Sequence, residues 1–422
     1  MMRYQQSKII TSAASYFMHH YTKHYLNVTD PSLGLPPPPE AKPYLLYIHV
    51  PFCSMFCPYC SFNKFTYTKE AATIYFKRLR EEILHVKALG YSFDYLVIGG
   101  GTPLIDEEEL IKTIELVKKH FKIEHVSCET DPNHIQPHTI EKLKGLVDRL
   151  SIGVQTFDDT LLKKLGRYEK FGSSEVVYEK IASMIGLLPI TSVDLIFNFP
   201  TQKEAGLIRD LELLKQLSPE QTSVYPLMTS SLVKNSVKKS LGEFSMTNEF
   251  NFFSLIKESL KEIYPSRHGW SFSKEHNVII DEYIIDHEEY VGVGSGSFSF
   301  LKDTLYLNDF ALDSYDSLIQ EKRTAVIKQR TFPANSQMYY RLMVDLFNGS
   351  LSKKHFETMF NTPIESALGK ELMLLRFAKA IEEHPEKITT TEFGDYLFLV
   401  LMKEFYMGMD RIRNEARKHL SL

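Results

Sequence analysis

Short apolar runs alternate with longer helical patterns through the first half of the chain. Six runs rich in β-branched and aromatic residues have the length and composition of parallel strands that are buried on both faces. They lie at residues 44–50, 95–98, 125–128, 149–154, 192–197 and 222–225. Residues 71–89 and the acidic start Asp106–Glu109 indicate helices between them. This alternation predicts an α/β fold, in which a right-handed βα array curls into a partial, TIM-like (β/α)6 barrel.

The pattern changes on both sides of this array. Residues 1–35 are polar and aromatic, and Pro36–Pro39 form a stiff, extended linker. Later helical patterns lie at residues 336–346, 367–384 and 391–404. Two short stretches suggest a hairpin at residues 387–391 and 396–401. We therefore expect an N-terminal extension with a Pro-rich linker (1–40), a barrel core (41–300) and an α-rich C-terminal domain (301–422).

The composition narrows the classes of function. The 422 residues are 43% hydrophobic and 24% charged, which is typical of a soluble globular protein with a large core. The net charge is −4 and there is no basic run, so nucleic acid is not favoured as a partner. The sequence shows neither a secretory signal nor an apolar run long enough to span a membrane. With few cysteines gathered in one place, these features predict a cytoplasmic protein.

The strongest chemical feature is a cluster of three of the four cysteines. Cys53, Cys57 and Cys60 have the spacing C-x3-C-x2-C. Three thiolates are one short of a tetrahedral zinc site or of a four-iron cluster held only by cysteine. A cubane held by three cysteines leaves one iron open for a small molecule. A zinc site completed by a remote histidine is the alternative, and we expect Cys128 to be a small buried thiol.

Other unusual residues follow the predicted strands, at the rim where βα arrays place their working groups. Glycine at 99–101 lets backbone approach a ligand, and Thr102 adds a hydroxyl. Glu129 can accept hydrogen bonds from ribose, and Arg167 can pair with a carboxylate. Asp194 lies within a buried strand and therefore needs a partner. Taken singly, a tight turn, a rim salt bridge or a solvated arginine would also explain these residues.

Several motifs in fixed order carry a resemblance to a known family. They are Tyr47–Cys60, Gly99–Pro103, Glu129–Pro132, Ser151–Gln155, Leu165–Arg167 and Asp194–Pro200. In this order they resemble the radical S-adenosylmethionine (SAM) enzymes of the porphyrin branch, which includes oxygen-independent coproporphyrinogen III oxidase and a related heme chaperone.

The resemblance implies a radical SAM barrel with two cofactors. A [4Fe–4S] cluster would be held by Cys53, Cys57 and Cys60, and its open iron would bind S-adenosyl-L-methionine. The implied SAM-site residues are Tyr47, Tyr59, Gly100, Gly101, Thr102, Glu129, Gln155, Arg167 and Asp194. His49 lies in the first motif, where a structural role is an equal alternative.

Further stretches suggest a particular member of this branch. Phe62 stands where the oxidase pattern carries another cysteine. The chain most resembles the anaerobic heme-degrading methyltransferases of the ChuW/HutW type, in stretches at residues 225–228, 270–274, 280–300 and 402–409. This implies heme breakdown by radical methyl transfer, with opening of the porphyrin ring and release of iron. The electron would come from a low-potential donor such as a reduced flavoprotein.

Two alternatives stay open, a heme-binding chaperone and an oxidase-like decarboxylation of coproporphyrinogen III. Either would also bind a tetrapyrrole. The loop Gly292–Ser297 is either an ordinary turn or a surface for a flat ring. Candidate heme-iron ligands, each with a plain surface role as the alternative, are His19, His20, His24, His268, His276 and His287.

Overall fold

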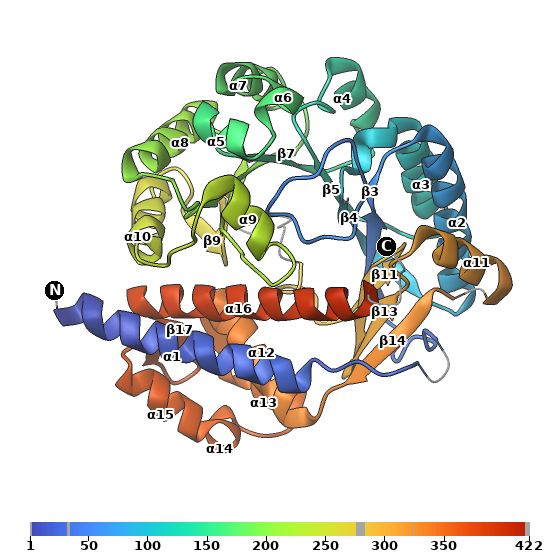
Figure 1. Ribbon diagram of the computed structural model, residues 1–422. Helices are drawn as coiled ribbons and strands as arrows, with labels where there is room; N and C mark the ends of the chain where they lie inside the picture. Colours follow the sequence, from blue (N-terminus) through green and yellow to red (C-terminus); the bar gives the residue numbers. More distant parts are fainter. Residues whose placement is uncertain (1, 32–33, 276–282, 323, 418–422) are drawn as a thin grey trace.

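A parallel sheet with helices on its outer face forms the centre of the molecule (Figure 1). The computed structural model describes residues 2–31, 34–275, 283–322 and 324–417. The six predicted strands are confirmed, and they lie side by side in chain order. They are β1 (Pro43–Val50), β4 (Ser92–Gly100), β5 (His125–Thr130), β6 (Arg149–Gln155), β7 (Ile190–Phe197) and β8 (Gln221–Pro226).

Helices connect these strands, as expected for a βα array. They are α2 (Lys69–Ala88), α3 (Glu107–His120), α4 (Pro137–Leu143), α5 (Asp159–Lys164), α6 (Tyr168–Phe171), α7 (Ser174–Ala182) and α8 (Glu204–Leu217), and α9 (Lys234–Leu241) and α10 (Glu249–Leu260) follow the last strand. The strands form an arc with most of these helices outside it, while α9 lies across the front of the arc, next to α5 (Figure 1). Nearly every residue of β1 is buried, because one face packs on the helices and the other faces the barrel interior.

The sheet continues beyond the six parallel strands at both edges. Strand β11 (Tyr290–Val293) pairs in parallel with β1, and β12 (Phe298–Leu301), β13 (Thr304–Asn308) and β14 (Val326–Thr331) follow it in antiparallel order. At the other edge lie β10 (Ser271–Ser273) and β9 (Ser266–His268). One sheet therefore crosses residue 300, and the expected division of the chain there stays a prediction.

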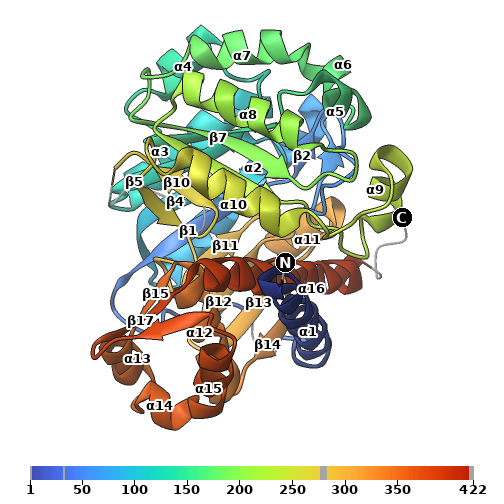
Figure 2. The same cartoon turned by 90° about the vertical axis from the view of Figure 1, so that its left-hand side faces the viewer.

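Helix α11 (Leu312–Lys322) packs beside α2 on the outside of the barrel (Figure 1). The elements after β14 form a layer on one side of the barrel (Figure 2). They are α12 (Ala334–Phe347), β15 (Ser350–Ser352), α13 (Lys353–Phe360), α14 (Ile364–Ala367), α15 (Gly369–Phe377), β16 (Ile381–Glu383), β17 (Lys387–Thr390) and α16 (Glu392–Arg417). The helix predicted over 367–384 was too long, since residues 381–383 form a strand. The second strand of the expected hairpin was wrong, because residues 396–401 lie inside α16. A short apolar run does not distinguish a strand from a helix.

The N-terminal residues form a helix that the sequence did not predict. Helix α1 (Met2–Tyr25) lies beside α16, and the two cross the open side of the barrel (Figure 1). Short segments complete the site region: β2 (Phe52–Cys53), β3 (Phe65–Thr66) and the 3-10 turn Pro103–Asp106. None of the helices in the described part of the chain has the length and apolar character needed to cross a bilayer.

A buried ion pair fastens α16 to the barrel. Lys403 Nζ lies 2.6 and 2.7 Å from the two carboxylate oxygens of Glu249 on α10, and the side chains are 1% and 0% exposed. Asn198, directly after β7, donates to the same carboxylate at 3.2 Å. The helix that covers the barrel is thus tied to the carboxyl end of a barrel strand.

Replacing Lys403 by Met should lower the free energy of unfolding by about 3–5 kcal/mol, because the Glu249 carboxylate stays buried without its cation. Urea unfolding followed by circular dichroism measures this loss. In the double variant Lys403→Met/Glu249→Gln no charge is left, and part of the stability should return. Equal losses in the two variants would contradict the assigned pairing.

Candidate functional site

A cavity of about 500 Å³ opens at the carboxyl ends of the barrel strands. Its walls come from the barrel, from α1, from α12 and from α16. The twelve predicted site residues all line this cavity: Tyr47, Cys53, Cys57, Tyr59, Cys60, Gly100, Gly101, Thr102, Glu129, Gln155, Arg167 and Asp194. The structure therefore brings together every residue that the motifs selected, and the contact that each makes with a cofactor stays a prediction.

The loop that carries the three cysteines, residues 51–63, packs tightly against the end of β4. We call it the cluster loop. The N–H of Gly101 donates to Val50 O at 2.8 Å, and the N–H of Thr102 donates to Phe52 O at 2.7 Å. A Cβ at position 101 would lie 2.4 Å from Phe52 O, so only glycine fits there. The glycines were expected to let a ligand approach; here Gly101 also lets the cluster loop approach the sheet.

A buried histidine holds the other end of the cluster loop. His49 Nε2 donates to Asn63 O at 3.0 Å, which leaves Nδ1 to accept from Tyr47 Oη at 3.0 Å. Asn63 Nδ2 in turn donates to Ser295 O at 3.3 Å and to Phe310 O at 3.1 Å. Burial lowers the pKa of His49 to about 4, so the ring is neutral at neutral pH. Of its two possible roles, these contacts support the structural one.

The glycine loop between β11 and β12 is a close-packed turn. A Cβ at Gly296 would lie 2.7 Å from Asn63, and one at Gly294 would lie 2.6 Å from His49 O. Gly294 and Gly296 both have positive φ, which favours glycine. Gly296 also lines the cavity. The turn therefore supports the cluster loop from the side opposite β4.

The three thiols lie close enough to affect one another. Burial, followed by the neighbouring Cys60 and Cys57, raises the pKa of Cys53 to about 11. Arg167 Nη1 lies 3.3 Å from Cys57 Sγ and 3.3 Å from Tyr59 Oη. A thiol must lose its proton to bind iron, and the buried guanidinium of Arg167 places a positive charge beside Cys57.

Asp194 has the partner that its position in a buried strand requires. Its carboxylate accepts hydrogen bonds from Ser151 Oγ on the adjacent strand at 2.9 and 2.8 Å, and from Ser192 Oγ at 3.2 Å. The fully buried Arg149 donates to the same Ser151 hydroxyl at 3.2 Å. Asp194 thus belongs to a polar network on the barrel floor and also faces the cavity.

Glu129 lies near the end of β5, and Gln155 ends β6, which runs between β5 and the strand of Asp194. Glu129 Oε2 accepts from the N–H of Gly100 at 3.2 Å, which holds the carboxylate against the glycines of β4. Gln155 has a φ of 78°, a left-handed conformation that side-chain-bearing residues rarely adopt. Backbone strain of this kind is concentrated at binding sites. Gln155 lines the cavity, which agrees with that tendency.

Sequence reasoning missed a charged group beside the cysteines. Asp131 accepts from Lys170 Nζ at 2.7 Å, from His134 Nδ1 at 2.6 Å and from Thr102 Oγ1 at 3.3 Å. Burial alone would raise its pKa, but His134 and Lys170 hold the pKa of Asp131 well below its usual range. Asp131 lies in the motif Glu129–Pro132, so the signal was present, but only tertiary structure brings Lys170 to it.

The cavity wall fits the two implied cofactors. Within the described residues, the buried polar atoms of cavity-lining residues that lack a hydrogen-bond partner include Trp270 Nε1, Arg167 Nε and Thr130 Oγ1. Such atoms usually meet a ligand or water. No three His, Cys, Asp or Glu side chains of the described chain are arranged around a single metal ion. In a cubane, by contrast, each cysteine binds a different iron.

The candidate heme-iron ligands are not brought into this cavity. His19, His20 and His24 lie on the exposed side of α1. His268 lies in β9, and His287 packs against Tyr95. None of these five lines the cavity, and His276 lies outside the described residues.

Comparison with known proteins agrees with this site. Residues 47–214 match the radical SAM superfamily. The heme chaperone HemW of Bacillus subtilis is 27% identical over 369 residues, which cover 83% of this chain and 96% of that protein. HemW of Lactococcus lactis is 28% identical and covers 84% and 94%. The oxygen-independent coproporphyrinogen III oxidase of Helicobacter pylori is 33% identical over 215 residues, 47% of this chain and 45% of that protein.

The fold has a solved counterpart. Coproporphyrinogen III oxidase (HemN) from Escherichia coli, described as a radical SAM enzyme, superposes with a TM-score of 0.71 at 21% identity, over 86% of this chain and 90% of that one. Residues 47–214 thus form a radical SAM domain. Within the superfamily, the chain is similar to HemW and HemN, and its cofactors are a [4Fe–4S] cluster and SAM.

The buried His49 should make stability depend on pH in the cluster-free protein. Its folded pKa of about 4 lies below that of the unfolded chain, so the unfolded chain binds more protons between these values. The free energy of unfolding should therefore fall as the pH falls from about 6.5 to about 4. Urea unfolding across this range should show a shallower fall for His49→Gln. Exposed His20, replaced by Gln, is the control, and parallel curves for wild type and His49→Gln would refute the assignment.

Asp194→Asn should slow reductive cleavage of SAM by about tenfold or more while the visible absorbance of the cluster is unchanged. The control is Asp210→Asn, because Asp210 is a buried carboxylate on α8 that bonds Thr156 and Phe157 away from the cavity. Cleavage is followed by chromatography of 5′-deoxyadenosine. If the Asp194→Asn variant is less stable but cleaves SAM at the normal rate, the role of Asp194 is confined to its hydrogen bonds with Ser151 and Ser192.

Proposed function

We propose that this chain is a heme-binding radical SAM protein of the heme chaperone kind. The heme chaperones HemW of Bacillus subtilis and Lactococcus lactis align over 96% and 94% of their length, whereas the oxidases of Escherichia coli and Helicobacter pylori align over 42% and 45% of theirs. This difference in coverage supports the chaperone over the oxidase. The names of these long-matching relatives support the chaperone over the heme-degrading methyltransferase that the ChuW/HutW resemblance implies.

A continuous series of aromatic rings in the cavity carries the proposal. We call it the aromatic belt: Tyr225, Trp270, Tyr406, Phe405, Tyr340, Phe300 and Phe332. Successive ring centroids are 5.2, 5.6, 6.0, 5.4, 6.2 and 6.4 Å apart. Aromatic faces and edges of this kind stack on flat apolar rings. A tetrapyrrole is such a ring, and a cavity of about 500 Å³ is within the size range of cofactor pockets.

The chain itself would hold and shield the reactants. Cys53, Cys57 and Cys60 would hold the cluster, which together with SAM supplies one-electron radical chemistry. Arg167 keeps a positive charge at the cysteines, and α1 and α16 supply part of the cavity wall. Exclusion of water protects reactive species and strengthens electrostatic contacts inside the site.

The second candidate is the heme-degrading methyltransferase. Its support is that the aromatic belt and the three cysteines share one cavity. A tetrapyrrole bound on the belt would therefore be open to attack by a radical formed at the cluster. Phe62 argues against the oxidase alternative, because it stands where the oxidase pattern has a cysteine. Its side chain is 44% exposed and lines the cavity.

Anaerobic incubation of the reconstituted protein with a strong reductant, SAM and heme separates these functions. A chaperone should leave heme intact and pass it to an apo-acceptor, as read from the acceptor's absorbance. A methylated linear tetrapyrrole with free iron, found by mass spectrometry, would instead establish the methyltransferase. Carbon dioxide released from coproporphyrinogen III would establish the oxidase. Failure to bind any tetrapyrrole would overturn the proposal.

Cys57→Ala should abolish the visible absorbance of the cluster and all SAM cleavage, because a thiolate ligand is lost. Cys128→Ala is the matched control, since Cys128 is a fully buried thiol away from the cavity, and it should keep both properties. A fully loaded Cys57→Ala protein would refute the ligand assignment. In the chaperone reading, heme binding on the aromatic belt should survive the Cys57 substitution.

A further inference from the structure

We propose that Arg413 of α16 binds a carboxylate of the tetrapyrrole, and that the cavity selects a ring with two carboxylates on one edge over a ring with four. This inference rests on the proposed function and names its substrate class. It concerns the half of the cavity that faces α1, β11–β14, α12 and α16.

Charge in the cavity is distributed unevenly. The barrel half contains five charged side chains at or near the strand ends: Glu129, Asp131, Arg167, Lys170 and Asp194. Lys64 follows the cluster loop, where its ammonium contacts Cys60 O and lies over Phe56. In the opposite half, the described lining residues include a single charged side chain, Arg413. The other lining residues of that half are aromatic, aliphatic, methionine or neutral polar side chains.

The Arg413 guanidinium is held in place before any ligand binds. Its central carbon lies 5.4 Å from the ring centroid of Phe62 in the cluster loop and 5.4 Å from that of Phe298 in β12. Nη1 also pairs with Asp410, three residues earlier on α16, and the Arg413 side chain is 12% exposed. A guanidinium carries five N–H donors, so this pair uses only part of its capacity. A fixed, partly desolvated arginine suits bidentate binding of a carboxylate.

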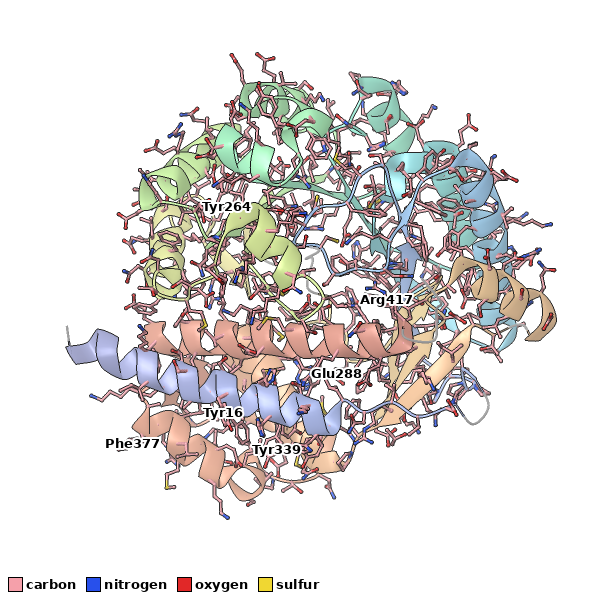
Figure 3. All side chains as sticks on the ribbon, viewed as in Figure 1. Tyr16, Tyr264, Glu288, Tyr339, Phe377 and Arg417 are labelled. Carbon is pink, nitrogen blue, oxygen red and sulfur yellow. The ribbon has the colours of Figure 1, made fainter. Side chains whose placement is uncertain are left out.

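The end of α16 brings this charge to the cluster loop. Arg417, labelled in Figure 3, donates through Nη2 to Ser61 O at 3.3 Å. This contact fixes the last turn of the helix, one turn beyond Arg413. Arg413 thus contacts Phe62 of the cluster loop and shares α16 with Phe405 and Tyr406 of the aromatic belt. We expect the edge of a ring stacked on the belt to meet it there.

The number and position of carboxylates then decide which ring fits. Burying a carboxylate without a partner costs several kcal/mol. In protoporphyrin the two propionates share one edge, so that edge can face Arg413 while the apolar edge meets the belt. In coproporphyrin each of the four pyrroles carries a propionate, so some carboxylates must face the apolar wall. One arginine cannot compensate for them.

Trp270 gives a direct measurement, because it is the one tryptophan of the chain and belongs to the aromatic belt. Quenching of its fluorescence by protoporphyrin IX, by its dimethyl ester and by coproporphyrin III should be titrated on the cluster-loaded protein. We expect protoporphyrin IX to bind about tenfold or more tightly than either of the others, as the loss of a charge-assisted bond predicts.

Arg413→Met should weaken protoporphyrin IX about tenfold and leave its dimethyl ester unchanged, since the ester has no carboxylate to lose. Arg413→Lys keeps the positive charge but loses the two parallel N–H donors of the guanidinium, so its affinity for protoporphyrin IX should be intermediate. The control is Arg411→Met on the same helix, because Arg411 bonds Thr22 and His19 O and does not line the cavity.

The outcomes are distinct. Without quenching by any porphyrin, the proposed function itself fails. Equal binding of protoporphyrin IX and its ester by the wild type overturns the role of Arg413, and this comparison needs no variant. Equal or tighter binding of coproporphyrin III overturns the selectivity. An equal effect of Arg411→Met and Arg413→Met would show a general loss of α16 packing and would also overturn the role.

Discussion

Two glycines lie against the cluster loop, and a side chain fits at neither position. Gly101 lies against the backbone carbonyl of Phe52 on one side, and Gly296 lies against the side chain of Asn63 on the other. His49 bridges the two sides through its bond to Asn63 O. Because the loop is held in this way, the three thiols keep a fixed position relative to Thr102 and Arg167, and the strand ends and the thiols can act on one ligand.

The cavity that results has two ends of different character. At the barrel end, hydrogen-bonded charges such as Asp131 with Lys170 lie in a buried, low-dielectric place, where electrostatic contacts are strong. At the other end, rings from β12, α12 and α16 offer an apolar surface. A polar nucleotide and a flat apolar ring thus have separate positions within reach of each other, which supports a protein that handles both.

The barrel and its rim could be read from the sequence because the information is local. Each strand is a short apolar run, and Thr102, Glu129 and Gln155 sit at or just beyond strand ends, where a βα array brings them together. The covering layer could not be read in this way. Helix α1 has weak amphipathic character and is held by α16, nearly the whole chain away. Strands β9 to β13 have three to five residues each, too few for a clear alternation, and Lys170 reaches Asp131 only through the fold.

The pairing of α1 with α16 also bears on the order in which the protein becomes complete. Helix α16 follows every barrel strand in the chain, so during synthesis α1 has no partner until the barrel and its cysteines have been made. The part of the cavity wall that α1 and α16 supply is therefore missing from the growing chain until the two helices dock. The cavity that contains the three thiols is wider open before docking than after it.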